Sequence, residues 1–149
     1  MRMIAVHSLL ALALCMARPV AAAPVWHWAY QGQGLRAEGR LTTTARPDAR
    51  GFYRVTSISG RRNGVAITRL VPAGRPIPGN APYPVDNLLR PGRNGLTEAG
   101  LGYALANGSH ASPFRKTHDR RTLEYLAAPR QRTGTGVEVP IRFTARRLR

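Results

Sequence analysis

The sequence feature that most constrains the fold is Asn63-Gly64, which stands between two runs of β-branched and apolar residues, 52–59 and 65–70. Asn and Gly readily adopt positive φ at both central turn positions, and such a turn matches the twist of two antiparallel strands. Residues 60–64 are therefore predicted to form the turn of a β-hairpin. Asn107-Gly108 predicts a second hairpin, between residues 101–106 and 110–115.

Strict alternation of apolar and polar side chains predicts half-buried strands elsewhere. In residues 25–30 the aromatics Trp26, Trp28 and Tyr30 share one face, which we interpret as core, with a stacking platform for sugars or bases as the alternative. The inward positions expected in residues 35–44 and 137–145 are Leu35, Ala37, Gly39, Leu41, Thr43, Val137, Val139, Ile141, Phe143 and Ala145. Pro140 falls on the outward face, which indicates an edge position or a bulge.

Together these patterns give about eight short strands, and no amphipathic helix follows the N-terminal apolar run. The fold class predicted is all-β, either a single antiparallel β-sandwich or a small up-and-down β-barrel. The sequence leaves both architectures open.

Residues 1–22 have the pattern of a secretory signal peptide, with Arg2 in a positive start, an apolar run and small residues before Pro24. We expect cleavage after Ala22, or alternatively after Ala21, and a single all-β domain in residues 23–149. The only cysteine, Cys15, lies inside the apolar run, where Leu14 disfavours the lipoprotein alternative. The mature chain is therefore expected to be periplasmic or extracellular, without disulfides and without a transmembrane segment.

The chain carries a formal charge of +16, and removal of Arg2 and Arg18 with the signal peptide leaves +14. Such a charge attracts polyanions, so anionic envelope glycans or lipids are possible partners, whereas nucleic acid is not expected for an exported protein. The alternative is that the arginines are ordinary solvated positions. They are spread along the chain, and the dense clusters are Arg120-Arg121 and the C-terminal residues 146–149.

Several segments together resemble a family of short exported bacterial β-domain proteins, many of which carry a PEP-CTERM sorting tail. The matching segments are GFYRVTSISGRRNGVAI (51–67), LVPAG (70–74), IPGNAPY (77–83), DNLL (86–89), LT (96–97), residues 100–108, SPF (112–114) and VPIRFTA (139–145). The resemblance implies a secreted β-domain of unknown biochemical role. The chain ends in Arg-Arg-Leu-Arg where that family has a hydrophobic sorting tail, so we expect a free periplasmic or extracellular protein.

The sequence assigns no catalytic residue, metal ligand or cofactor. The seven carboxylates are dispersed, and the adjacent pairs Ser109-His110 and His118-Asp119 point to opposite faces if they lie on strands. The histidines lack zinc spacing, and the Asx residues match no calcium loop. We therefore predict a chain that is not an enzyme. A small hydrolase using His110 or His118 is the least favoured alternative.

Residues 71–84 hold five of the twelve prolines, a density that neither a helix nor a central strand tolerates. Long loops in compact domains are frequently functional. We therefore predict a non-catalytic binding or interaction domain of unknown ligand, with a binding surface formed by Asn80, Tyr83, Asp86 and Asn87. A cationic protein bound to envelope glycans or lipids is the second hypothesis. In the purely structural alternative the loop covers an open barrel end, with Ile77 and Tyr83 as plugs.

Overall fold

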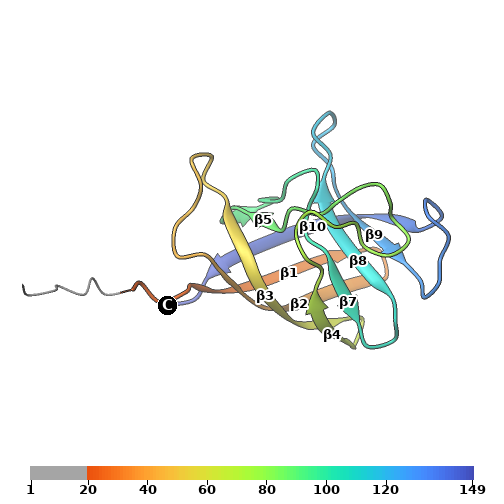
Figure 1. Cartoon of the computed structure of the whole chain (residues 1–149), viewed down its shortest axis with the longest axis horizontal. Helices are drawn as coiled ribbons and strands as arrows, with labels where there is room; N and C mark the ends of the chain where they lie inside the picture. The colour runs from red at the N-terminus through yellow and green to blue at the C-terminus, as the bar shows by residue number, and fades with distance from the viewer. Residues whose placement is uncertain (1–19) are drawn as a thin grey trace, which may run out of the picture.

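The computed structural model describes residues 20–149, so most of the predicted signal peptide and Cys15 lie outside the described residues. Figure 1 shows the strands curving around one another, with loops at both ends. The strands are β1 (Val25–Gly32), β2 (Leu35–Thr43), β3 (Tyr53–Arg62), β4 (Val65–Leu70), β5 (Leu88–Leu89), β6 (Gly92–Arg93), β7 (Tyr103–Leu105), β8 (His110–Arg115), β9 (Thr122–Ala127) and β10 (Val137–Arg147).

Eight of these strands form a closed antiparallel barrel in the order β1-β2-β3-β4-β7-β8-β9-β10, and β10 pairs back onto β1. The two short strands lie beside this path, since β5 pairs with β3 and β6 pairs with β10. The predicted all-β class is therefore confirmed, and of the two architectures left open the barrel is the correct one.

The hairpin turns explain how neighbouring strands follow one another around the barrel. Asn63 and Gly64 have φ of 44° and 78°, the positive values that a two-residue hairpin turn requires. The predicted turn of residues 60–64 was too long, because β3 continues to Arg62. This extension has a consequence for the interior, since it places Arg62 opposite Ala37 on the inward face.

The barrel interior is filled by side chains, with Trp26, Trp28 and Tyr30 all 2% exposed or less. The interpretation of these aromatics as core is therefore confirmed. Trp28 lies opposite Gly39, and Gly39 lies opposite Gly60. A Cβ at Gly39 would collide with the backbone of Ser59 and Gly60, so the two glycines allow the strands to approach closely beside the large indole.

The proline-rich loop lies against the outside of the barrel wall. Ile77 is fully buried in a second small core with Val71, Val85, Tyr125 and Ala127. Tyr125 alternates along β9 with inward residues, so its ring points outward and the loop covers it.

One end of the barrel is closed by the segment that follows the proline-rich loop, and not by that loop itself. Leu89, Leu96 and Leu101 belong to the main core, and β5 and β6 pair beside the start of β3 and near the end of β10. Ile77 and Tyr83, predicted as possible plugs of a barrel end, do not fill one. Ile77 is buried in the second core, and Tyr83 is 67% exposed.

β10 differs from the predicted strand at its beginning. Val137, expected to point inward, is 59% exposed. Residues Val137 to Pro140 pair only with β9, whereas β1 pairs from Ile141 onward, so Val137 lies beyond the end of β1. Pro140 is paired with Leu123 on one side and lies outside the β1 ladder on the other, which is a local edge position.

Candidate functional site

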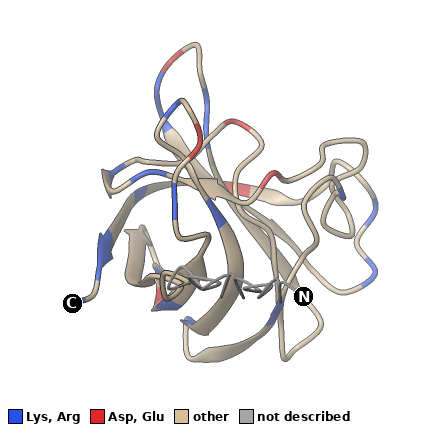
Figure 2. Cartoon of the chain, turned by 60° about the vertical axis from the view of Figure 1, so that its left-hand side comes forward, with Lys and Arg blue, Asp and Glu red and all other residues tan. Residues whose placement is uncertain are grey.

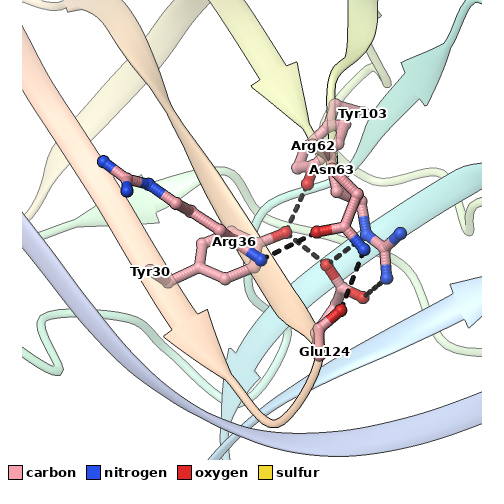
Figure 3. Close-up of polar contacts among 7 residues, drawn as sticks. Tyr30, Arg36, Arg62, Asn63, Tyr103 and Glu124 are labelled. Atoms are coloured by element: carbon pink, nitrogen blue, oxygen red, sulfur yellow. Dashed lines mark hydrogen bonds and ion pairs between the residues drawn. The ribbon is translucent and has the colours of Figure 1, made fainter.

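A buried polar cluster of Tyr30, Arg62, Tyr103 and Glu124 lies inside the barrel (Figure 3). The Glu124 carboxylate is fully buried and accepts two hydrogen bonds from the Arg62 guanidinium, at 2.8 and 2.5 Å. It also accepts a hydrogen bond from the Tyr30 hydroxyl, which is in turn hydrogen-bonded to the Tyr103 hydroxyl. The bidentate pairing satisfies the buried charge on both partners.

The sequence reasoning missed this Glu124 cluster. Glu124 was one of several dispersed carboxylates, and Arg62 was placed in a turn. Alternation puts Thr122, Glu124 and Leu126 on one face of β9 and Leu123 and Tyr125 on the other, but both faces carry apolar residues, so the pattern does not mark Glu124 as an inward residue. The Arg62 side chain is 12% exposed, and the other members of the cluster are almost completely covered, so the cluster offers no open surface to a substrate.

The environment of the cluster shifts three ionisation equilibria. Burial, with the neighbouring Tyr103 and Glu124, raises the pKa of Tyr30 well above its ordinary value of 10.0. Burial and the charge of Glu124 likewise raise the pKa of Tyr103. Burial alone would lower the pKa of Arg62, but its hydrogen bonds and attraction to Glu124 outweigh that effect and raise it.

We expect Tyr30 and Tyr103 to ionise only as the barrel unfolds in alkali. A group with a raised folded-state pKa stabilises the fold below its unfolded pKa, here about 10, and this contribution is lost as the pH rises above that value. Tyrosinate absorbance and circular dichroism measured in one titration should therefore show a tyrosinate step that coincides with unfolding. Tyr30→Phe and Tyr103→Phe should each remove part of that step. If both phenols ionise while the barrel signal is intact, the cluster is not sealed.

A second feature is a basic outer surface on β1, β2, β3, β6 and β10, which we call the arginine wall. The strand register places Arg40, His27 and Arg146 side by side in one row, and Arg36, Gln31 and Arg142 in another. Between these rows, Glu38 is the single acidic residue. The members of the arginine wall are Arg36, Arg40, Arg61, Arg93, Arg142 and Arg146.

The positive charge of the arginine wall is largely uncompensated. Within residues 20–149, the only ion pair that a wall arginine makes is the exposed contact between Arg36 and Glu38, at 3.3 Å. A groove of about 470 Å³ on the wall is lined by Arg36, Arg93 and Arg142, with Glu38 as its one acidic lining residue. Figure 2 shows basic positions over much of the barrel and few acidic ones. Exposed, unpaired guanidinium groups are available to bind phosphate or carboxylate groups.

The structure separates the four residues predicted from the sequence as a binding surface. Asn87 is 1% exposed, donates to the Val71 carbonyl at 2.7 Å and accepts from the Gly102 amide at 3.0 Å. Asp86 accepts hydrogen bonds from the Leu88 amide and the Thr97 hydroxyl. Both side chains therefore hold the loop to the barrel.

Asn80 and Tyr83, in contrast, line an open cleft of about 470 Å³ between the proline-rich loop and the ends of β8, β9 and β10. The other residues of this cleft are Pro84, Glu98, Ala99, Ser112, Phe114, Lys116, His118, Tyr125 and Glu138. The loop thus contributes two of the four predicted residues to one surface.

Within residues 20–149, neither of the two histidines considered for catalysis is hydrogen-bonded to both a carboxylate and a hydroxyl. The Nε2 atom of His110 is buried without a hydrogen-bond partner, and burial with the nearby Arg69 lowers the pKa of this imidazole. His118 contacts the carboxylate of its neighbour Asp119 at 3.5 Å. In the described part of the chain, neither imidazole is hydrogen-bonded to a serine or threonine hydroxyl, as nucleophilic catalysis would require.

No protein-family model, curated protein or solved structure matches this chain. Over residues 20–149 no helix is both long and apolar enough to cross a membrane. In the same range, no three His, Cys, Asp or Glu side chains lie close enough together to hold a metal ion.

Proposed function

We propose that this chain is an exported, non-catalytic binding domain that attaches through the arginine wall to anionic glycans or lipids of the cell envelope. The observation that supports this proposal is the arginine wall itself, where six arginines face solvent with one carboxylate among them. Export is proposed from the signal-peptide pattern of residues 1–22 and agrees with the resemblance to exported bacterial β-domains.

The filled interior favours an outer surface over an internal cavity as the place of binding. Small barrels can enclose one ligand when their interior is hollow. Here Trp26, Trp28, Tyr103 and Phe143 fill the interior and are 1% exposed or less. A ligand of this domain is therefore expected to contact the outside of the wall.

The geometry of the wall suits a charged surface or an extended polymer better than a single small anion. In each row the two arginines lie on β2 and β10 with β1 between them, so their backbones are about 10 Å apart and their guanidinium groups can contact separate anionic groups of one ligand. Each arginine near an anionic membrane contributes about 1 kcal/mol, and this contribution is screened within about 10 Å at moderate salt. Binding through the wall should therefore be strong only at low ionic strength.

The test compares two variants that each lose four positive charges. Replacing Arg36, Arg40, Arg142 and Arg146 by glutamine removes most of the wall, whereas replacing Arg46, Arg75, Arg130 and Arg132 removes exposed arginines elsewhere. At low salt the wall variant should bind phosphatidylglycerol vesicles or heparin about 1,000-fold more weakly than the unmodified chain, and the control variant should change much less. Co-sedimentation and heparin retention separate lipid from glycan binding. Equal losses in both variants, or binding that does not change with salt, would contradict the proposal.

A further inference from the structure

The cleft beside the proline-rich loop has a different charge from the arginine wall. Two of the chain's seven acidic residues, Glu98 and Glu138, line this cleft, together with Lys116 and His118. Two further grooves on the described surface are each lined by at least one arginine, and no arginine lines this cleft. An anion is therefore favoured on the arginine wall and disfavoured in the cleft.

The cleft combines aromatic surface with polar groups that can still form further hydrogen bonds. The Tyr83 ring is 67% exposed, and Phe114 and the largely buried Tyr125 also line the cleft. The Tyr125 hydroxyl donates to the Gly79 carbonyl at 2.7 Å and accepts from the Gly136 amide at 2.9 Å, which fixes the ring. Aromatic side chains of this kind provide flat apolar faces against which a ring-shaped ligand can pack.

The polar side chains supply both donors and acceptors. Glu98 uses Oε2 to accept from the Thr117 hydroxyl, and Glu138 uses Oε2 to accept from Lys116 at 3.3 Å, so each retains its Oε1 oxygen. Lys116 and the Asn80 amide can donate further hydrogen bonds. A ligand that matches this lining is uncharged, has an apolar face and carries several hydroxyl groups that both donate and accept.

We infer that this cleft binds a neutral hexose unit of a glycan, with Tyr83 packed against the sugar ring and Glu98, Glu138, Lys116 and Asn80 bonded to its hydroxyls. The cleft volume of about 470 Å³ lies within the usual range of small-molecule sites, about 300–1,000 Å³. The inference does not depend on polyanion binding, because the cleft and the arginine wall share no residue.

The test is an NMR titration of the folded ¹⁵N-labelled chain with maltotriose and with triacetylchitotriose as probes. At least one of the two sugars should shift the amide signals of the cleft, with saturation at about millimolar concentration. Tyr83→Ala should weaken this binding at least about tenfold by removing the aromatic face, and Glu98→Gln should weaken it less, because an amide still accepts a hydrogen bond.

The control is Val25→Ala, which removes a partly exposed apolar side chain far from the cleft lining and should leave sugar binding unchanged. The amide spectrum of each variant also reports whether the barrel is folded. The inference is overturned if neither sugar shifts the cleft signals at about 20 mM, well above a millimolar dissociation constant. It is also overturned if Tyr83→Ala binds as tightly as the unmodified chain, or if spermidine and not sugar shifts these signals. The variants that remove the arginine wall should retain sugar binding.

Discussion

Glu124→Ala is expected to lower the free energy of unfolding by about 3–5 kcal/mol, because removal of one partner of a buried ion pair leaves the other charge uncompensated. The Arg62 guanidinium would lose both of its hydrogen bonds to the carboxylate, and the Tyr30 hydroxyl would lose its acceptor. Folded domains of this size are stable by only about 5–15 kcal/mol, so the variant should be close to unfolding at physiological temperature. Urea denaturation followed by circular dichroism measures the change.

Glu38→Ala is the matched control for this prediction. Glu38 also pairs with an arginine, but its side chain is 47% exposed and that of Arg36 is 74% exposed. An exposed pair of this kind contributes about 0–1 kcal/mol. A similar loss of stability in Glu38→Ala and Glu124→Ala would show that burial of the Glu124 pair has no special cost.

Replacing both members of the buried pair should cost less than the two single changes predict together. The double variant Glu124→Leu with Arg62→Met removes the two charges and leaves the Tyr30 and Tyr103 hydroxyls bonded to each other. Apolar replacements of a buried pair are frequently neutral or stabilising. We therefore expect the double variant to be more stable than Glu124→Ala, and additive losses in a double-mutant cycle would contradict direct coupling.

Trp28→Ala is expected to destabilise the barrel by about 3–5 kcal/mol, the usual cost of removing a large buried aromatic side chain. Trp28 is 0% exposed, and its ring lies 5.7 Å from that of Tyr30 and 6.1 Å from that of Tyr103. Its indole also donates to the Arg40 carbonyl at 3.2 Å. Gly39 and Gly60 lie opposite and carry no side chains that could fill the space.

Val137→Ala is the control, and thermal unfolding of the two variants compares truncation of a buried side chain with truncation of an exposed one. Val137 is 59% exposed, so its truncation should change stability by less than about 0.5 kcal/mol. Trp28→Phe should fall between the two, because it keeps a ring in the cavity and loses the hydrogen bond to Arg40. A loss for Trp28→Ala no larger than that for Val137→Ala would show that the interior is not packed around this indole.

The strands were predictable because local signals and the barrel agree. Alternation in residues 25–30 and 35–44 placed Trp28 and Leu41 inward, as observed, and Asn63-Gly64 marked a hairpin that the structure contains. Barrel closure was not predictable, because a sandwich and a barrel use the same alternation. They differ in whether the last strand pairs with the first, and no local pattern reports that contact.

The Glu124 cluster was not predictable for a related reason. On β9 both faces are covered, one by the barrel interior and the other by the proline-rich loop, so alternation no longer marks a solvent face. Glu124 and its partners are distant in sequence, and only the barrel brings them together. The structural role of Asn87 was not predictable for the same reason. Its side chain bonds the backbone of Val71 and Gly102, which only the folded chain brings next to it.

Closure of the barrel by β1 and β10 has a consequence for how the chain acquires its structure. The first strand to be synthesised finds its second partner only in the last one, from Ile141 to Arg147. Contacts between such distant segments are formed slowly, because a long loop must be ordered before they yield any stabilisation. Until then β1 and residues Ile141–Arg147 of β10 lack each other as partners, and each leaves an edge where intermolecular strand pairing can begin. We therefore expect closure of the barrel to be the last step in the folding of these strands.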